Sequence, residues 1–150
     1  MSRIALFGGT FNPVHNGHIN LCLECHKKLN FDKILLIPDN IPPHKSSDDL
    51  AGNAHRLNML KIAAKENELF EVCDIEYKLK GTSYTVNTIA ELKKIYKEDE
   101  LFLIIGSDML FMFDRWFCYE KILKSVTLVA GARKKTNMTL WLNIKSVSQS

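Results

Sequence analysis

Residues 3–18 read RIALFGGTFNPVHNGH, an apolar run followed by two glycines and a polar turn with two histidines. The apolar run is typical of a strand buried on both faces of a parallel sheet. Gly8 and Gly9 end that run, and glycine lets a backbone pass close to a ligand. His15 and His18 lie three residues apart, so they can share one side of a first helical turn. The stretch therefore predicts a strand, a ligand-binding loop and a helix in succession.

The chemistry of this loop indicates phosphate. Backbone N–H groups of a glycine-containing loop and of a helix N-terminus donate readily to phosphate oxygens. Imidazole titrates close to physiological pH, so His15 and His18 can donate to the same oxygens. A Gly-Gly turn alone, or a His-x-x-His pair alone, is more often structural. Their occurrence together, directly after an apolar strand, favours a phosphate-binding loop.

Outward from this stretch, apolar runs alternate with helical patterns. Strands are expected at 33–37, 70–77, 101–105 and 126–130, a loop at 39–53, and helices at 19–29, 54–67, 82–97, 108–113 and 119–124. In the helix at 54–67 the apolar side chains, Ile62 among them, are expected to face inward. The alternation predicts an α/β fold, a Rossmann-like parallel sheet with right-handed crossovers and helices on both faces. Ligands of such sheets bind beyond the carboxyl ends of the strands, so the loops that begin at Gly8, Asp39 and Gly106 should converge.

The composition excludes several classes of function. The chain has 150 residues, which suits one domain, with 46% hydrophobic and 25% charged residues. A net charge of +3, without a dense Lys/Arg patch, fits an anionic small substrate but does not indicate nucleic acid. No apolar run reaches the roughly 18 residues of a membrane span, and the first residues lack a signal-peptide pattern. We therefore expect a cytoplasmic protein without nucleic-acid or membrane partners.

The cysteines predict no metal site. Cys22, Cys25 and His26 have the spacing of a c-type haem attachment motif. That attachment requires export, and the stretch lies within a helical pattern, so we interpret both cysteines as partly buried small hydrophobic residues. Cys73 and Cys118 lack the second close pair that a zinc site needs.

The stretch quoted first resembles the His-x-Gly-His motif of the nucleotidylyltransferase superfamily. Two later segments, IPDNIPPHK at 37–45 and GTSYTVNT at 81–88, are similar to those of bacterial nicotinate-nucleotide adenylyltransferases. IGSD at 105–108, then Trp116 and Arg133, continue the resemblance, which runs from residue 3 to 134. It implies a nucleotidylyltransferase-type fold that transfers AMP from ATP to nicotinate mononucleotide, giving nicotinate adenine dinucleotide and pyrophosphate.

The resemblance also implies an ATP site. His15 and His18 are its catalytic pair, binding the triphosphate and stabilising the charge that grows on the α-phosphate. The remaining implied contacts of ATP are Gly8, Gly9, Thr10, Phe11, Gly106 and Asp108. Asp108 is either a ribose partner or a helix-capping residue. Mg²⁺ accompanies ATP, held mainly by the nucleotide and water rather than by protein ligands.

The implied acceptor site consists of Lys45, Ser83, Tyr84, Thr85, Trp116 and Arg133. Trp116 offers a stacking face for the pyridine ring, and Thr85 offers a hydroxyl at a helix start, where backbone N–H groups favour an anion. Each has a structural alternative: Trp116 as a core aromatic, Thr85 as an N-cap and Lys45 as a solvated loop residue. Where many family members have Tyr after the Trp, this chain has Phe117.

The resemblance stops near the end of the chain. The family normally continues with an Ile-Ser-Ser-Thr segment and a nearby Arg that hold the ATP phosphates, and residues 136–150 lack that pattern. We therefore expect a nucleotidylyltransferase domain at 1–135 and an atypical tail at 136–150, from a truncated or frame-shifted reading, with weakened ATP binding.

Two alternatives stay open beside the enzyme for nicotinate mononucleotide. One is a nucleotide-binding but catalytically impaired fragment, which the missing segment favours. The other is phosphopantetheine adenylyltransferase, against which His15 and Lys45 argue. The sequence does not decide between nicotinate and nicotinamide mononucleotide, nor whether the chain forms a homo-oligomer.

Overall fold

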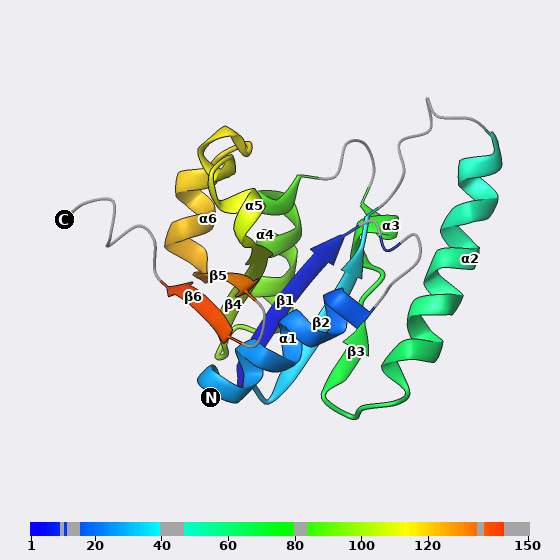
Figure 1. The fold of residues 1–150 in the computed structure, drawn as a ribbon. Coiled ribbons are helices and arrows are strands. Elements are labelled where there is room, and N and C mark those ends of the chain that lie inside the picture. The colour runs from blue at the N-terminus through cyan, green and yellow to red at the C-terminus, as the bar shows by residue number, and fades with distance from the viewer. Residues whose placement is uncertain (10, 12–15, 40–46, 80–83, 135–136, 143–150) are drawn as a thin grey trace.

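The computed structural model of the chain describes residues 1–9, 11, 16–39, 47–79, 84–134 and 137–142 (Figure 1). In chain order, its elements are β1 (Arg3–Gly9), α1 (Asn16–Leu29), β2 (Lys33–Pro38), α2 (Ser47–Ala64), β3 (Phe70–Val72), α3 (Ile75–Lys78), α4 (Thr85–Ile95), β4 (Glu100–Gly106), α5 (Ser107–Leu110), the 3-10 helix η1 (Phe113–Arg115), α6 (Tyr119–Ser125), β5 (Thr127–Lys134) and β6 (Asn137–Leu142).

The described strands form one sheet in the order β3-β2-β1-β4-β5-β6. All neighbouring pairs from β3 to β5 are parallel, and β6 pairs with β5 in the antiparallel direction. The predicted Rossmann-like parallel sheet is therefore confirmed. The antiparallel strand at its edge was not expected, and it lies within the segment 136–150. The domain boundary at 135 stays a prediction.

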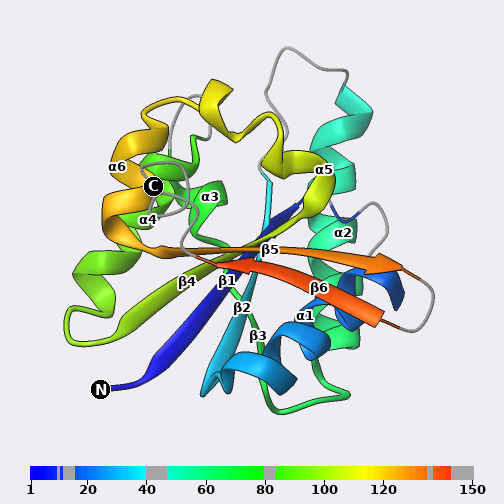
Figure 2. The same ribbon diagram turned by 60° about the vertical axis from the view of Figure 1, so that its left-hand side comes forward.

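Helices cover both faces of the sheet, as predicted. In Figure 2, α1 and α2 lie on one side of the strands, and α4 and α6 lie on the other. Successive side chains of β1 point to opposite faces of the sheet: Ile4 and Leu6 belong to one buried cluster, and Ala5 and Phe7 belong to the other. This is the period-two alternation of a strand buried on both faces.

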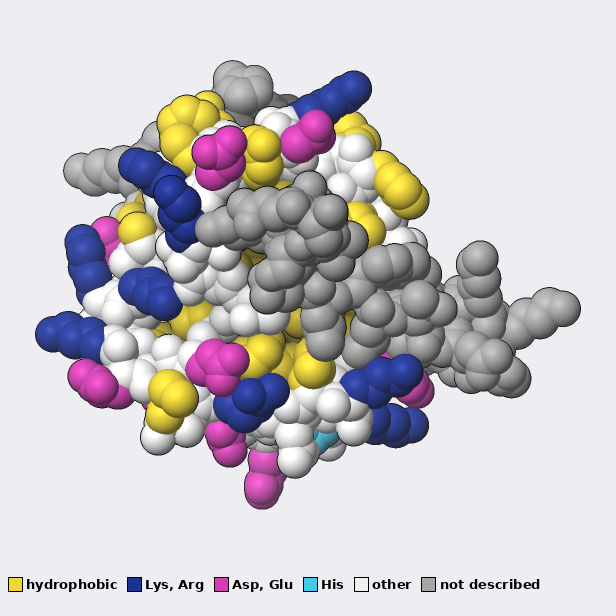
Figure 3. Space-filling model, turned by 90° about the vertical axis from the view of Figure 1, so that its left-hand side faces the viewer, with side chains coloured by type: hydrophobic (Ala, Val, Ile, Leu, Met, Phe, Trp, Pro, Cys, Tyr) yellow, Lys and Arg dark blue, Asp and Glu magenta, His cyan; other side chains and the backbone are white. Residues whose placement is uncertain are grey.

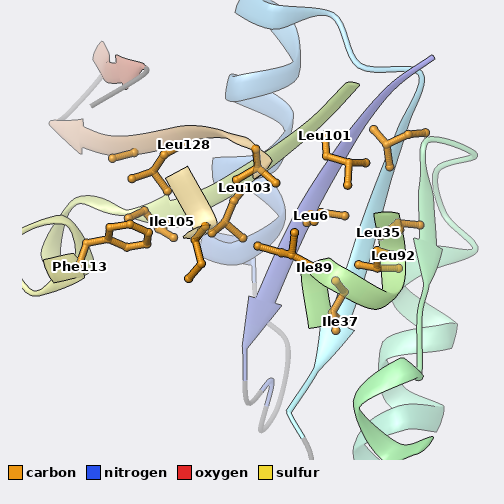
Figure 4. Close-up of a cluster of buried hydrophobic side chains, with 14 residues drawn as sticks. Leu6, Leu35, Ile37, Ile89, Leu92, Leu101, Leu103, Ile105, Phe113 and Leu128 are labelled. Carbon is orange, nitrogen blue, oxygen red and sulfur yellow. The ribbon is translucent and has the colours of Figure 1, made fainter. Parts of the chain in front are cut away.

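Figure 4 shows the buried cluster beneath α4 and α6. Leu6, Leu103 and Leu128 point into it from three neighbouring strands, and Ile89 and Leu92 of α4 meet them. Burying each such side chain stabilises the fold by roughly 1.5–3 kcal/mol. The apolar runs thus place the strands side by side, with their carboxyl ends at one edge.

Two expected elements differ from the structure between β2 and α4. Helix α2 begins at Ser47, so the predicted loop at 39–53 is wrong for 47–53. Ser47 and the two aspartates after it suit a first helical turn, and this outweighs Gly52. The predicted strand at 70–77 ends at Val72, and its last residues belong to α3.

The expected orientation of Ile62 is also wrong, because its side chain is 65% exposed. Leu60 is the fully buried residue of this turn of α2. A residue two positions further on is rotated by about 200° around the helix axis, so Ile62 faces away from the sheet. Among the described residues, no helix has the length and apolarity needed to cross a membrane.

Candidate active site

The strand order reverses between β1 and β4. From β1 the chain adds β2 and then β3 on one side, and β4 then pairs with the other side of β1. Crevices at such a switch bind ligands in open α/β sheets. Gly9 ends β1 and Gly106 ends β4, so the predicted phosphate loop and the Gly106 segment begin on adjacent strands.

The third predicted loop begins beside the first. Gly9 is in register with Pro38, and the Asp39 N–H donates to the Gly9 carbonyl oxygen at 2.9 Å. The guanidinium Nη2 of Arg56, a buried residue of α2, donates to the Asp39 carbonyl oxygen at 2.9 Å. The loops after β1 and β2 therefore leave the sheet together, as the sequence predicts.

The two glycines at the end of β1 have different surroundings. Gly8 is exposed, and a methyl group placed on it would meet only the Ile37 carbonyl oxygen, at 3.6 Å. A methyl group on Gly9 would lie 3.3 Å from two carbons of the Phe11 ring. Gly8 thus leaves the backbone open to a ligand, whereas Gly9 makes room for a side chain of the loop itself.

Phe11 connects the loop to the first turn of α1. Its backbone has a positive φ of 47°, and its side chain is 3% exposed. The ring lies 5.3 Å from the imidazole of His18, at an interplanar angle of 90°. Phe7 of β1 lies against both rings, at 5.7 Å from Phe11 and 6.1 Å from His18. The predicted ATP contact His18 is therefore held among aromatic rings on the α1 side of the sheet.

Gly106 and Asp108 form the other half of the predicted ATP site. Gly106 is the N-cap residue of α5, and no side chain caps that helix. The interpretation of Asp108 as a capping residue is therefore wrong. Its carboxylate is exposed and lies over Gly106, since a methyl group there would come within 2.7 Å of Oδ1. The chain positions an anionic acceptor of hydrogen bonds directly beyond the end of β4.

The structure brings two distant segments of the predicted acceptor site together. Tyr84 is the N-cap residue of α4 and Thr85 its first residue, so Thr85 is not the N-cap. The Tyr84 ring lies 4.6 Å from that of Phe117. Trp116, adjacent to Phe117, is partly buried against Phe113 at 4.8 Å. Trp116 is therefore partly a core aromatic, and its remaining surface is accessible.

Several predicted site residues lie outside the described residues: Thr10, His15, Lys45 and Ser83. Of Arg133 only the backbone is described, in register with Met138 of β6. Their predicted roles stay predictions.

A buried polar pair beside the acceptor segment was not predicted. The Thr88 hydroxyl of α4 donates to Glu76 Oε2 of α3 at 3.1 Å, and both residues are buried. The sequence carries one signal for Thr88, because it stands four residues before Leu92 on the buried face of the helix. Glu76 was missed because its segment resembles a strand.

Cys22 and Cys25 are fully buried on the α1 side of the sheet. Burial raises the pKa of the Cys25 thiol to about 12 and raises the pKa of Cys22 well above its ordinary value. Metal ions bind the thiolate, and a raised pKa keeps these thiols protonated. The two cysteines therefore act as small apolar residues of the core. No cluster of three or more His, Cys, Asp or Glu suited to a metal ion occurs within the part of the chain that the structure describes.

Figure 3 shows the side of the molecule that carries the segment between β4 and β5. Hydrophobic side chains lie at the top of this view, with acidic and basic side chains among them, and further hydrophobic side chains lie lower down. The large exposed hydrophobic residues of that segment are Met109, Phe111, Met112 and Phe117. The acceptor half of the predicted site is therefore bordered by apolar surface.

Comparisons with known proteins give consistent results. The sequence profile of the cytidylyltransferase-like family matches residues 6–148. The chain is 42% identical over 133 residues to a "probable nicotinate-nucleotide adenylyltransferase" of Shouchella clausii, across 89% of this chain and 69% of the relative. It is 38% identical over 133 residues to the nicotinate-nucleotide adenylyltransferase of Bacillus subtilis, across 89% and 70%.

The fold has a counterpart among solved structures. The nicotinic acid mononucleotide adenylyltransferase of Plasmodium falciparum, solved as a complex with APC, aligns with a TM-score of 0.73. The alignment covers 99% of this chain and 70% of that one at 17% identity. At this identity the similarity concerns the fold alone.

Proposed function

Because the chain belongs to the cytidylyltransferase-like family and, within it, to the nicotinate-nucleotide adenylyltransferases, we propose that it transfers AMP from ATP to nicotinate mononucleotide. The products are nicotinate adenine dinucleotide and pyrophosphate, in a step of NAD biosynthesis. The observation that carries this proposal is the position of Gly8, Gly9 and His18 at the carboxyl end of β1, beside the strand-order switch. Ligands of open α/β sheets bind at that point.

The reaction is an in-line attack by a phosphate oxygen of the mononucleotide on the α-phosphorus of ATP, with pyrophosphate leaving. Phosphoryl and nucleotidyl transfers of this kind depend on positioning and charge neutralisation rather than on a covalent nucleophile. The sheet edge suits that requirement. It presents exposed backbone at Gly8 and an imidazole at His18.

We assign the triphosphate to the loop after β1. In this assignment Gly8, Gly9, Thr10 and Phe11 contribute backbone or hydroxyl contacts, and His15 and His18 bind the oxygens on which charge develops. Support comes from the exposed Gly8 and from His18 standing in the first turn of α1. Gly106 and Asp108 serve the adenosine half, with the exposed Asp108 carboxylate as acceptor for a ribose hydroxyl.

The acceptor mononucleotide is assigned to the region between α4 and α6. Tyr84, Thr85 and Trp116 contact it here, together with Lys45, Ser83 and Arg133. The contact between Tyr84 and Phe117 supports this assignment, because it joins the two segments that carry these residues. Accessible aromatic surface and the N-terminus of α4 suit a flat ring that bears a carboxylate.

Mg²⁺ enters as part of the substrate, bound to ATP. In this proposal the ion is held mainly by phosphate oxygens and water. The ion neutralises part of the polyphosphate charge, and the loop after β1 orients the same phosphates. The cytoplasmic location, the lack of a nucleic-acid partner and homo-oligomer formation stay predictions.

The test is pyrophosphate release from ATP and Mg²⁺ with nicotinate mononucleotide, nicotinamide mononucleotide or phosphopantetheine as acceptor. We expect release that requires nicotinate mononucleotide and falls by about 10²–10³ in the His18→Ala variant. Release with phosphopantetheine alone would contradict the proposal. No release with any acceptor, from protein shown to be folded by circular dichroism, would support a nucleotide-binding but catalytically impaired chain.

A further inference from the structure

We propose that the side chain of Phe11 is a positioning residue, which holds the His18 imidazole in the orientation that meets the triphosphate. This inference rests on the proposed function in one respect, the assignment of His18 to phosphate. It adds a role for the ring of Phe11, a residue that the resemblance implies only as a contact of ATP.

The backbone of Phe11 adopts a strained conformation. Its φ of 47° lies in the left-handed region, where a bulky side chain is a rare outlier. Such a conformation costs about 1–3 kcal/mol and persists when the surroundings determine it. Glycine or asparagine would build an easier turn, so the strain indicates a requirement on where this side chain points.

The ring of Phe11 packs against residues of strand β1. The Phe11 side chain is buried, although it belongs to the loop at the open edge of the sheet. Gly9 lies so close that a methyl group there would be 3.3 Å from the ring, and Phe7 supports the ring from β1 at 5.7 Å. Among the described residues, strand β1 therefore holds the ring through Gly9 and Phe7.

The ring of Phe11 contacts the imidazole of His18. His18 lies perpendicular to it at 5.3 Å, the edge-to-face arrangement that aromatic pairs prefer. The Phe7 ring, at 6.1 Å, lies against the same imidazole. Two neighbouring rings restrict the χ angles that the His18 side chain can adopt. Stabilisation of a developing oxyanion requires donors placed in advance at hydrogen-bond distance, so this restriction serves the transition state.

A double-mutant cycle separates this role from simple core packing. The four proteins are the unmodified chain, Phe11→Leu, His18→Ala and the double variant. Two quantities are measured on each: kcat and KM with both substrates, and the affinity for a non-hydrolysable ATP analogue by calorimetry. Phe31→Leu is the matched control, because Phe31 is a buried phenylalanine of the same cluster whose ring contacts are Phe102 and His26 rather than His18.

We expect Phe11→Leu to lower kcat by about ten- to a hundredfold, with KM for the mononucleotide little changed. In the His18→Ala background the same substitution should change kcat by no more than about twofold, since residues that act as a unit are non-additive. Phe31→Leu should lower the melting temperature but leave kcat per folded molecule within about twofold. An equal loss of kcat with and without His18, or no loss at all, overturns the proposal.

The affinity measurement keeps the two proposals distinguishable. If the unmodified chain binds the analogue but releases no pyrophosphate, the proposed function fails, and the cycle is read from the affinities alone. A weakening by Phe11→Leu that disappears without His18 then supports the positioning role, and an additive weakening overturns it. If the unmodified chain does not bind the analogue, both proposals are overturned. Phe11→Met, which retains apolar volume, replaces Phe11→Leu if the latter does not fold.

Discussion

The two glycines that end β1 are neighbours in sequence, yet we expect their alanine variants to lose different properties, stability in one case and ATP binding in the other. A methyl group on Gly9 forces the Phe11 ring to move by a few tenths of an ångström, and overpacking of this kind costs about 1–3 kcal/mol. Gly9→Ala should therefore lower both the melting temperature and kcat. An alanine methyl group at Gly8 would make only ordinary contacts, so Gly8→Ala should leave the melting temperature nearly unchanged. If Gly8 binds ATP as proposed, the methyl group would obstruct the phosphates, and Gly8→Ala should raise KM for ATP.

Thermal unfolding and initial rates at varied ATP check both expectations. Equal losses of melting temperature would contradict the difference between the two sites. The sequence predicts that Gly8 and Gly9 let the backbone pass close to a ligand. It does not predict that Gly9 makes room for the Phe11 ring, because this depends on the backbone angle of Phe11, which no residue pattern encodes.

Helices α3 and α4 are joined by the buried Thr88–Glu76 hydrogen bond at the segment where Tyr84 and Thr85 begin α4. Thr88→Val keeps the side-chain shape but leaves Glu76 without this donor. Loss of one partner of a buried hydrogen bond costs about 1–3 kcal/mol. We expect that loss in the free energy of unfolding in urea, and expect Thr88→Ser, which retains the hydroxyl, to recover most of it.

The control for the two Thr88 variants is Asn87→Ala, at the exposed neighbouring position of the same helical turn. It should change the free energy of unfolding by no more than about 0.5 kcal/mol. If Thr88→Val is equally mild, the hydrogen bond contributes little and packing alone fixes the start of α4.

The elements that the sequence predicts correctly share a local signal. Strands β1, β2 and β4 are continuous apolar runs, and burial on both faces produces such runs without reference to partners. The start of α2 and the whole of α3 were mispredicted, since Pro42, Pro43 and Gly52 indicate a loop and the alternation at 70–77 indicates a strand. There, tertiary packing overrides weak propensity. Strand β6 pairs with β5 a few residues earlier in the chain, with Asn137 in register with Lys134, and it was missed because residues 136–150 were interpreted as an atypical tail.

For the whole molecule, the end of the sheet away from the candidate site is held by Arg3. Its guanidinium donates to the carbonyl oxygens of Leu29 and Asn30, ending α1, and to Glu100 of β4 at 3.1 Å. It also lies 4.6 Å from the centre of the Phe102 ring. One side chain thus ties together β1, α1 and β4, the elements that carry His18 and Gly106 at the other end.

We expect that substitution of Arg3 lowers the stability of the fold but leaves the catalytic rate unchanged. Arg3 and Glu100 are each 37% exposed, so their ion pair contributes at most about 1 kcal/mol. The hydrogen bonds to carbonyl groups contribute about 0.5–1.5 kcal/mol each. Arg3→Ala should therefore lower the free energy of unfolding by about 2 kcal/mol, with kcat per folded molecule unchanged. Lys94→Ala, which removes an exposed ion pair with Glu91 within α4, should cost no more than about 0.5 kcal/mol. A fall in kcat at unchanged stability in Arg3→Ala would instead show that the two ends of the sheet are coupled, and that the site depends on how α1 and β4 are held far from it.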